Sequence, residues 1–451
     1  MALHSIEETA KAIAALATGF DGDTSRRARL LAQIDKLRYL VEGPTDPILT
    51  QWASVTTISA LSILTSTGTL AAIPRSGTVS STELATKTGL DESVIARCMR
   101  LICIQGIACE PAPDRYSHDA KSLAFIEGHS KHLFNTLLDH IDPFLKSPEY
   151  FRTHNSAALR DVRHAPYSYG HGRDGIAYYD VISEKQERLE AFNGTLALIN
   201  ETLPILGMFP FSSLKAQVEV EPHRPFIVDV GGGIGEVLKE IQKEAPAGFG
   251  AQMILQERPD VLRSLDDEAI PHITKMEHDF FTPQPVKDAH VYLLRRVLHD
   301  FYEPECVQIV RHVASAMAPD SRLLIGDFVL PEKTHLGDDT FLYWMDFAMM
   351  MLTGKEKSAE EFRSILDEAG LEMVKIWSSP SSSASLFGGG ATFLFASETM
   401  LFFGGGGDRE DSGEEVFLLR FLADLLPALP GEGDPAAGAF LRRDEDRERE
   451  V

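Results

Sequence analysis

Cysteine is scarce in this sequence, and its scarcity excludes two ways of stabilising a fold. The 451 residues contain only Cys98, Cys103, Cys109 and Cys306. Four thiols cannot cross-link so long a chain into a disulfide scaffold, and none of them has the paired C-x-x-C spacing of a structural zinc site. We therefore expect reduced, buried thiols and a cytoplasmic location.

Positive charge and long apolar runs are also in short supply. Lys and Arg number 43 against 67 Asp and Glu, which gives a net charge of −24 and argues against a nucleic-acid partner. Residues 1–20 lack the basic segment of a secretory signal. No uninterrupted apolar run approaches the roughly 20 residues of a membrane span, and Asp346 breaks the nearest one, at 341–352. We expect neither nucleic acid nor membrane as a partner.

The composition of the chain changes twice along its length. With 44% apolar residues it can build a full core, and its length suggests two or three domains of about 150 residues. We predict a mainly helical region at 1–185 and an α/β domain at 186–398. After Lys375 there is no Lys, His, Asn or Gln, and glycine runs and mixed charges follow. Residues 399–451 therefore predict a low-complexity tail, disordered or aberrant, to which we assign no chemistry.

Residues 81–116 have the order of a winged helix. STELATKTG at 81–89 predicts a short helix that ends at a glycine, 91–105 predict a second helix, and CEPAPDRY at 109–116 predicts a turn between short strands. A DNA-binding winged helix needs a basic second helix. This one places Asp91 and Glu92 against two arginines, so we expect a packing or dimerisation module instead.

From residue 226 onward, short β-branched runs alternate with helical segments. FIVDV at 226–230, MIL at 253–255, AHVYLL at 289–294 and RLLIG at 322–326 are typical of strands buried in a parallel sheet. Segments 234–244 and 305–316 predict helices between them, 186–208 predict a long helix that precedes them, and ATFLFA at 391–396 offers a last strand. This alternation predicts a Rossmann-like, doubly wound α/β fold.

A glycine-rich loop follows the first of these strands. It reads DVGGGIG and contains Asp229, Gly231, Gly232, Gly233 and Gly235. A dinucleotide loop would need a further glycine at position 236, where Glu236 would instead repel a pyrophosphate, and no P-loop motif is present. A G-x-G-x-G loop preceded by an acid suits a cationic ligand without phosphate, such as S-adenosylmethionine.

Three further residues follow the neighbouring predicted strands. Glu257 comes just after the second strand, where a carboxylate can bind both hydroxyls of a ribose. Asp279 and Phe280, in HDFF, lie where a carboxylate and an aromatic face would meet an adenine ring. We predict that these residues, with Asp229, line a cofactor site.

Polar residues from three later loops predict a catalytic group. His299 lies in LLRRVLHDF after a strand, Asp327 closes the next strand in GDFVLP, and Glu356 lies in GKEKS before a helix with capping-box spacing. Ligands of open α/β sheets bind at the carboxyl ends of the strands. The three side chains can therefore converge on one hydroxyl.

The motifs DVGGGIG, HDFF, LLRRVLHDF, GDFVLP and GKEKSAEEF follow one another in this order. With them, residues 48–376 resemble the plant-type and fungal S-adenosylmethionine-dependent O-methyltransferases that act on phenols, the caffeic-acid-type enzymes. The resemblance implies that His299 is the general base, that Asp327 and Glu356 bracket its imidazole, and that the winged-helix region builds a homodimer. It places cofactor contacts at Gly231, Gly232, Glu257, Asp279, Phe280 and Arg295. Two positions depart from the family: Glu257 replaces an Asp in D-L-P, and Arg295 stands where plant members often have Lys.

The expected reaction is methyl transfer to a phenolic hydroxyl of a small aromatic polyketide or phenylpropanoid. A histidine base deprotonates the phenol, so we expect no metal requirement. Candidate residues of the acceptor pocket are Phe192, Asn193, Tyr343, Trp344, Asp346 and Met350, with the alternative that each is plain core packing. A non-catalytic scaffold with this fold and an N-methyltransferase are the competing hypotheses.

Overall fold

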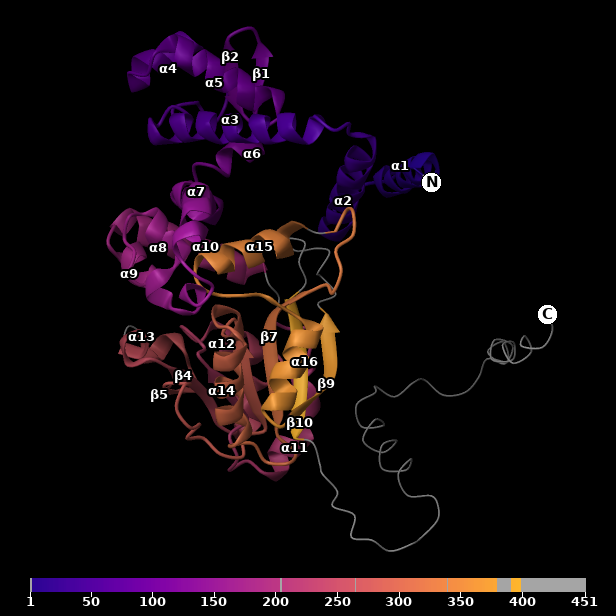
Figure 1. Cartoon of the computed structure of the whole chain (residues 1–451), viewed down its shortest axis with the longest axis vertical. Coiled ribbons are helices and arrows are strands. Elements are labelled where there is room, and N and C mark those ends of the chain that lie inside the picture. Colours follow the sequence, from indigo (N-terminus) through magenta and orange to yellow (C-terminus); the bar gives the residue numbers. More distant parts are fainter. Residues whose placement is uncertain (1, 203–204, 264, 339, 379–390, 399–451) are drawn as a thin grey trace, which may run out of the picture. The chain divides into compact units, whose positions relative to one another are not determined.

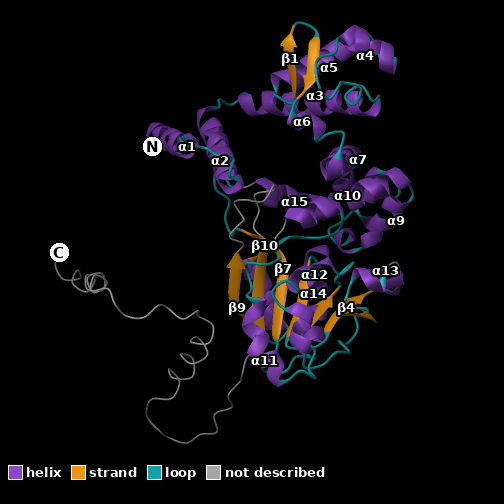
Figure 2. Ribbon diagram, turned by 180° about the vertical axis from the view of Figure 1, so that it is seen from behind, coloured by secondary structure: helices purple, strands orange, loops and turns teal. Residues whose placement is uncertain are grey.

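The computed structural model describes residues 2–202, 205–263, 265–338, 340–378 and 391–398 (Figures 1 and 2). All of these residues belong to one compact unit. The predicted tail at 399–451 therefore lies outside the described residues.

The first three helices are α1 (Ala2–Ala17), α2 (Thr24–Val41) and α3 (Asp46–Ser66). By length and composition alone, α3 could cross a membrane. Thr and Ser interrupt its apolar residues, so it contains no long uninterrupted apolar run. Length and composition are weak evidence for a membrane span, since core helices pass the same test. Only 22% of the apolar window of α3 is buried, so this helix presents much of its surface outward.

The predicted order of helix, helix and hairpin is confirmed. It consists of α4 (Ser81–Thr88), α5 (Glu92–Ile104), β1 (Ala108–Ala112) and β2 (Arg115–His118). A capping box between Ser80 and Glu83 begins α4, and Gly89 ends it in the left-handed region at φ 76°. The strands β1 and β2 pair antiparallel, and their core joins α3 through fully buried Leu64, Ile95 and Tyr116.

A second helical group follows. Its members are α6 (Ala120–Leu123), α7 (Gly128–Thr153), α8 (Pro166–Gly170), α9 (Tyr178–Ser183) and α10 (Gln186–Thr202). The predicted helix at 186–208 is shorter than expected: α10 ends at Thr202, and residues 205–208 are not helical. Pro204 in the sequence explains the end, because proline lacks an N–H and disfavours helix in the residue before it.

The predicted parallel sheet is confirmed, with one reversed strand. Its order is β5-β4-β3-β6-β7-β10-β9, and β8 (Lys357–Ser358) pairs with the end of β7. β10 runs antiparallel between β7 and β9, while β3, β4, β5, β6 and β7 pair in parallel. The strands are β3 (Ile227–Val230), β4 (Met253–Glu257), β5 (Ile273–Glu277), β6 (Val291–Arg295), β7 (Arg322–Leu330), β9 (Leu371–Ser378) and β10 (Ala391–Glu398).

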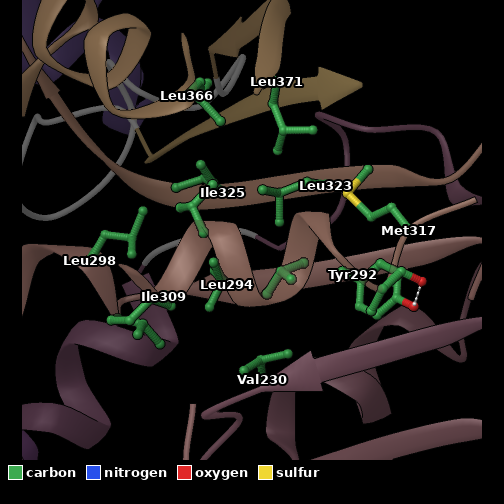
Figure 3. Close-up of a cluster of buried hydrophobic side chains, with 14 of the residues drawn as sticks. Val230, Tyr292, Leu294, Leu298, Ile309, Met317, Leu323, Ile325, Leu366 and Leu371 are labelled. Carbon is green, nitrogen blue, oxygen red and sulfur yellow. Dashed lines mark hydrogen bonds between the residues drawn. The ribbon is translucent and has the colours of Figure 1, made fainter. Parts of the chain in front are cut away.

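Each face of the sheet has its own apolar core, because alternate residues of a strand point to opposite faces. On one face Val228 and Val230 of β3 join side chains of α14 (Glu303–Ala314) and α16 (Ala359–Glu368) (Figure 3). On the other face Ile227 packs with α11 (Lys215–Val220), α12 (Glu236–Ile241) and α13 (Pro259–Arg263). Asp229 is two residues after Ile227 in β3, so its side chain points to the same face of the sheet, and it is buried.

Both views of the molecule show α10 and α15 (Thr340–Met351) across one end of the sheet (Figures 1 and 2). The loops at this end follow β3, β6 and β7, so it is the carboxyl end of the parallel strands. The helical and α/β regions meet where an open sheet binds its ligands.

Candidate active site

The glycine loop lies directly against Asp229. A Cβ atom on Gly232 would come within 2.4 Å of Asp229 Oδ2 and 2.5 Å of Leu255 Cδ1, so any other residue here would displace one of these side chains. Gly231 has φ 73°, and its Cβ would approach Val297 at 3.0 Å and the Phe280 ring at 3.6 Å. The main chain of the loop therefore lies close to the Asp229 carboxylate and the Phe280 ring, both of which the sequence predicts for the cofactor site.

Asp229 is a buried carboxyl group that lacks a hydrogen-bond partner. It is 1% exposed, and neither of its oxygens has a partner among the described residues. The pKa of Asp229 is raised to about 7, mainly by burial. Arg295 opposes this increase, and Glu257 adds to it. Such a group is costly to bury alone, and a cation beside it would stabilise the ionised form.

The other predicted cofactor residues end neighbouring strands at the same edge. Glu257 ends β4, and its Oε2 accepts a hydrogen bond from the Arg258 N–H at 2.5 Å, while burial raises its pKa. Asp279 follows β5 and accepts a bond from the Phe281 N–H at 3.0 Å. Arg295 ends β6, and burial lowers its pKa to about 10, which still leaves a cation at neutral pH.

His299 and Glu356 form a buried pair. His299 lies in the short helix η6 (Leu298–Asp300), and its Nδ1 is 3.0 Å from Glu356 Oε1. The two residues are 5% and 1% exposed. The other ring nitrogen of His299, Nε2, lies 3.6 Å from Asp300 Oδ1, too far for a strong hydrogen bond.

The loop that carries Glu356 is fixed to the main chain of the His299 turn. The Lys355 N–H donates to the His299 carbonyl oxygen at 2.8 Å, and a Cβ on Gly354 would approach that oxygen to 2.5 Å. Lys357 is fully buried, and its Nζ donates to the carbonyl oxygens of Leu298, Phe301 and Lys355 at 2.8 to 2.9 Å. These contacts hold the imidazole and the carboxylate in one position.

Burial shifts the pKa of each acid and base in this group in the direction that favours the uncharged form of the side chain. It lowers the pKa of His299 to about 4, an effect that Arg296 reinforces and Asp300 opposes. It raises the pKa of Glu356 to about 7 and that of Asp327 to about 6. Asp327 is 2% exposed, and its oxygens have no hydrogen-bond partner among the described residues. At neutral pH His299 is therefore an unprotonated base.

A cavity of about 1300 Å³ lies between the glycine loop and the helices at the end of the sheet. The predicted residues that line it are Phe192, Asp229, Gly231, Gly232, Gly233, Arg295, His299 and Trp344. The predicted residues outside its lining are Asn193, Glu257, Asp279, Phe280, Asp327, Tyr343, Asp346, Met350 and Glu356. Asp327 and Glu356 thus lie behind the lining, where the charge of His299 interacts with Asp327 and the ring of His299 contacts Glu356.

The cavity face of α15 differs from the predicted one. The residues that line the cavity here recur at helical spacing. They are Trp344, Met345, Ala348, Met349 and Leu352. The Tyr343 hydroxyl instead donates to Asp338 Oδ2 at 3.2 Å. Asp346 Oδ1 accepts a hydrogen bond from the Glu356 N–H at 3.0 Å, so it supports the partner of His299.

Apart from Phe192, the sequence analysis did not identify the opposite wall of the cavity. It comes from α7, α9 and α10, and it includes Leu133, Leu137, His140, Phe144, Tyr178 and Thr195. Residues 133, 137, 140 and 144 recur every three or four positions, which is the signal of one helix face.

Comparisons with known proteins identify the family of this chain. Residues 153–372 match the family model of the O-methyltransferase domain. The O-methyltransferase hmp5 of Hypomyces subiculosus is 39% identical over 359 residues, 79% of this chain and 89% of that protein. The chain belongs to the O-methyltransferase family.

More distant members and structures extend the comparison. The O-methyltransferase kntB of Aspergillus niger is 32% identical over 82% of this chain and 89% of its own length. The crystal structure of OxaC in complex with SAH and oxaline has a TM-score of 0.70 and 22% identity, and covers 88% of this chain and all of that one. The predicted membership of the family and the predicted Rossmann-like fold with a helical N-terminal region are confirmed.

Among the described residues of this O-methyltransferase, two groups of three have metal-ligand chemistry, and neither lines the cavity. They are His154, His164 and Asp174, and Glu221, His290 and Asp320. In the second group Arg224 already supplies a cation, since it donates to Glu221 at 2.6 Å and to Asp320 at 2.9 Å.

Proposed function

We propose that this chain transfers the methyl group of S-adenosylmethionine to a phenolic hydroxyl of a small aromatic metabolite, with His299 as the general base. The observation that carries the proposal is the position of His299. It lines the same cavity as the glycine loop, and Glu356 contacts its Nδ1. A base and a cofactor loop in one cavity are what methyl transfer to a hydroxyl requires.

The His299–Glu356 contact supports a base at Nε2. When the carboxylate of Glu356 accepts a hydrogen bond from Nδ1–H, the lone pair of the imidazole is on Nε2. A phenol has a pKa of about 10, so the acceptor arrives protonated at neutral pH. Nε2 takes this proton as the oxygen becomes nucleophilic, and the Glu356 carboxylate stabilises the imidazolium that forms. The cofactor supplies an electrophilic methyl group on a sulfonium.

Asp229 and the glycine loop fit a cationic cofactor. The unpartnered carboxyl of Asp229 would favour the positive charge of the cofactor, and Gly231, Gly232 and Gly233 leave room for its close approach. We assign the ribose to Glu257 and the adenine ring to Asp279 and Phe280, because these residues end adjacent parallel strands beside this loop. Arg295 balances the acidic groups around them.

The acceptor would lie between α10 and α15. Phe192 and Trp344 remain our assignments there, together with Met345 and Met349, whose flexible thioethers suit a flat ring. Asp346 acts through the Glu356 main chain rather than on the acceptor. Asn193, Tyr343 and Met350 do not line the cavity, so we do not assign them to the acceptor.

We also propose that a second copy of the chain covers α3. Ile48, Leu49, Trp52 and Val55 follow one another at helical spacing and are 65 to 74% exposed. Such an apolar stripe is unusual on the surface of a monomer, and a homodimer would bury it. The cytoplasmic location stays a prediction.

Calorimetry and a transfer assay test the proposed function together. The chain should bind S-adenosylmethionine, and a panel of phenols should accept its methyl group. His299→Ala should keep the binding and lower transfer by about 10²- to 10⁴-fold, whereas His312→Ala, in α14 and outside the cavity lining, should change neither. Binding without transfer to phenols or amines would favour the scaffold, and transfer to amines alone would favour N-methylation.

A further inference from the structure

His140 brings a polar atom to the apolar wall of the cavity. It lies in α7, is 8% exposed, and lines the cavity opposite the loop of His299. Its Nδ1 is 2.8 Å from the carbonyl oxygen of Thr136. A carbonyl oxygen can only accept a hydrogen bond, so Nδ1 carries the proton and donates it.

The second nitrogen of His140 is therefore a hydrogen-bond acceptor. Burial lowers the pKa of His140, so the ring is neutral at pH 7 and Nε2 has a free lone pair. Among the described residues, Nε2 has no hydrogen-bond partner, because the one hydrogen bond of His140 is at Nδ1. Because the small exposed part of this side chain lies in the cavity wall, the lone pair is available to a bound molecule.

Tyr178 provides a second polar atom nearby. Its ring centroid is 6.4 Å from that of His140, it is 3% exposed, and it lines the same cavity. Its hydroxyl also has no hydrogen-bond partner among the described residues, and burial raises its pKa well above 10, so it stays protonated. Neither polar atom has a protein partner and neither is fully buried, so each can pair with a ligand in the cavity.

The His140 ring is held in place by its neighbours. Tyr167 packs 4.7 Å from it, and the Tyr167 hydroxyl donates to Asp139. Arg188 fixes the same carboxylate through an Nε bond of 2.9 Å. The acceptor atom is therefore presented in one fixed orientation, as specific recognition requires.

We propose that His140 and Tyr178 form a second polar subsite that selects aromatic acceptors with a further hydroxyl besides the one that is methylated. This inference rests on the proposed function. His140 Nε2 accepts a hydrogen bond from that hydroxyl, and the Tyr178 hydroxyl donates to its oxygen. A methoxy group has the oxygen but no hydrogen to donate, so it leaves Nε2 unpaired.

Equilibrium binding of matched probes tests the subsite. Dihydroxynaphthalene isomers and their monomethyl ethers are titrated by calorimetry into the full chain with S-adenosylhomocysteine present. At least one isomer should bind about 10- to 100-fold tighter than its ether, the range expected for one buried hydrogen bond that the ether leaves unmade. His140→Phe should bring this ratio close to one, and Tyr178→Phe should reduce it. His140→Gln should restore most of it, because its side-chain amide oxygen can take the place of Nε2.

Leu137→Ala is the matched control, since Leu137 lines the same wall of α7 without a polar group. It should weaken the diol and the ether alike. Absence of any diol preference in the wild-type chain, or the same preference in His140→Phe, would overturn the inference. Preferential binding without methyl transfer would instead count against the proposed function alone, and transfer without preference against the subsite alone.

Discussion

Replacing Glu356 by Gln tests whether the buried carboxylate controls the base. Burial raises the pKa of Glu356 to about 7. Below that pH the carboxyl group is protonated and donates to His299 Nδ1, which moves the imidazole proton to Nε2 and removes the base from the cavity. Above it the carboxylate accepts from Nδ1–H and frees Nε2. We therefore expect kcat of the wild-type chain to rise as the pH increases through about 7.

The size of the effect follows from the 3.0 Å contact between Nδ1 and Oε1. At an effective dielectric constant of about 20, two unit charges at this distance attract by about 5 kcal/mol. With the proton about half transferred in the transition state, Glu356→Gln should lose about 2 to 3 kcal/mol of stabilisation. This corresponds to a decrease in kcat of roughly 30- to 150-fold.

The assay is the pH profile of kcat for one phenolic acceptor, with saturating S-adenosylmethionine. Glu356→Gln should lower kcat by this factor and abolish the inflection near pH 7, because the amide does not titrate. Glu360→Gln, in the exposed first turn of α16, is the matched control and should keep the wild-type profile. A Glu356→Gln chain with kcat within about threefold of wild type and the same inflection would refute this account of the base.

Four further predictions follow from the same geometry. Affinity for S-adenosylmethionine should rise with pH through about 7, because only ionised Asp229 attracts a cation, and calorimetry of Asp229→Asn should show no such rise. Gly232→Ala should weaken cofactor binding at least about tenfold, since its Cβ would lie 2.4 Å from Asp229 Oδ2; unchanged affinity would contradict the tight loop. Lys357→Met should lower the free energy of unfolding in urea by about 3 kcal/mol, and a loss under about 1 kcal/mol would mean that its three carbonyl contacts matter little. Trp52→Glu should convert the dimer to a monomer in light scattering after size exclusion, and a wild-type chain that is already monomeric would remove the dimer proposal.

The sheet and the positions of the acids and the histidine could be predicted from the sequence. β3 is a run of β-branched residues followed at once by glycines, and both features depend on neighbours in the chain. His299 follows β6 of the parallel sheet, so it was expected at the carboxyl edge, and the loop before β8 brings Glu356 to it. Topology alone was enough for His299.

The walls of the cavity could not be predicted in the same way. The sequence predicted a mainly helical region at 1–185 but no bounds for α7, which continues through Pro143 and Pro148, so the helix face that carries His140 was not identified. On α15 the residues that face the cavity depend on the rotation of the helix over the sheet, which placed Met349 rather than Met350 in the wall. Side-chain direction on a packed helix is a tertiary property, and no local pattern determines it.

The division of the cavity between two kinds of element has a consequence for how this protein can be redesigned. The glycine loop and the proposed base follow strands of the sheet, and the loop of Glu356 is fixed to the base by the bond from the Lys355 N–H to the His299 carbonyl oxygen. The proposed acceptor wall comes from α7, α9, α10 and α15, outside the sheet. Substitutions in those helices can therefore change which molecule is held without moving the atoms that react. A library confined to the helix faces would explore new acceptors while the chemistry stays constant.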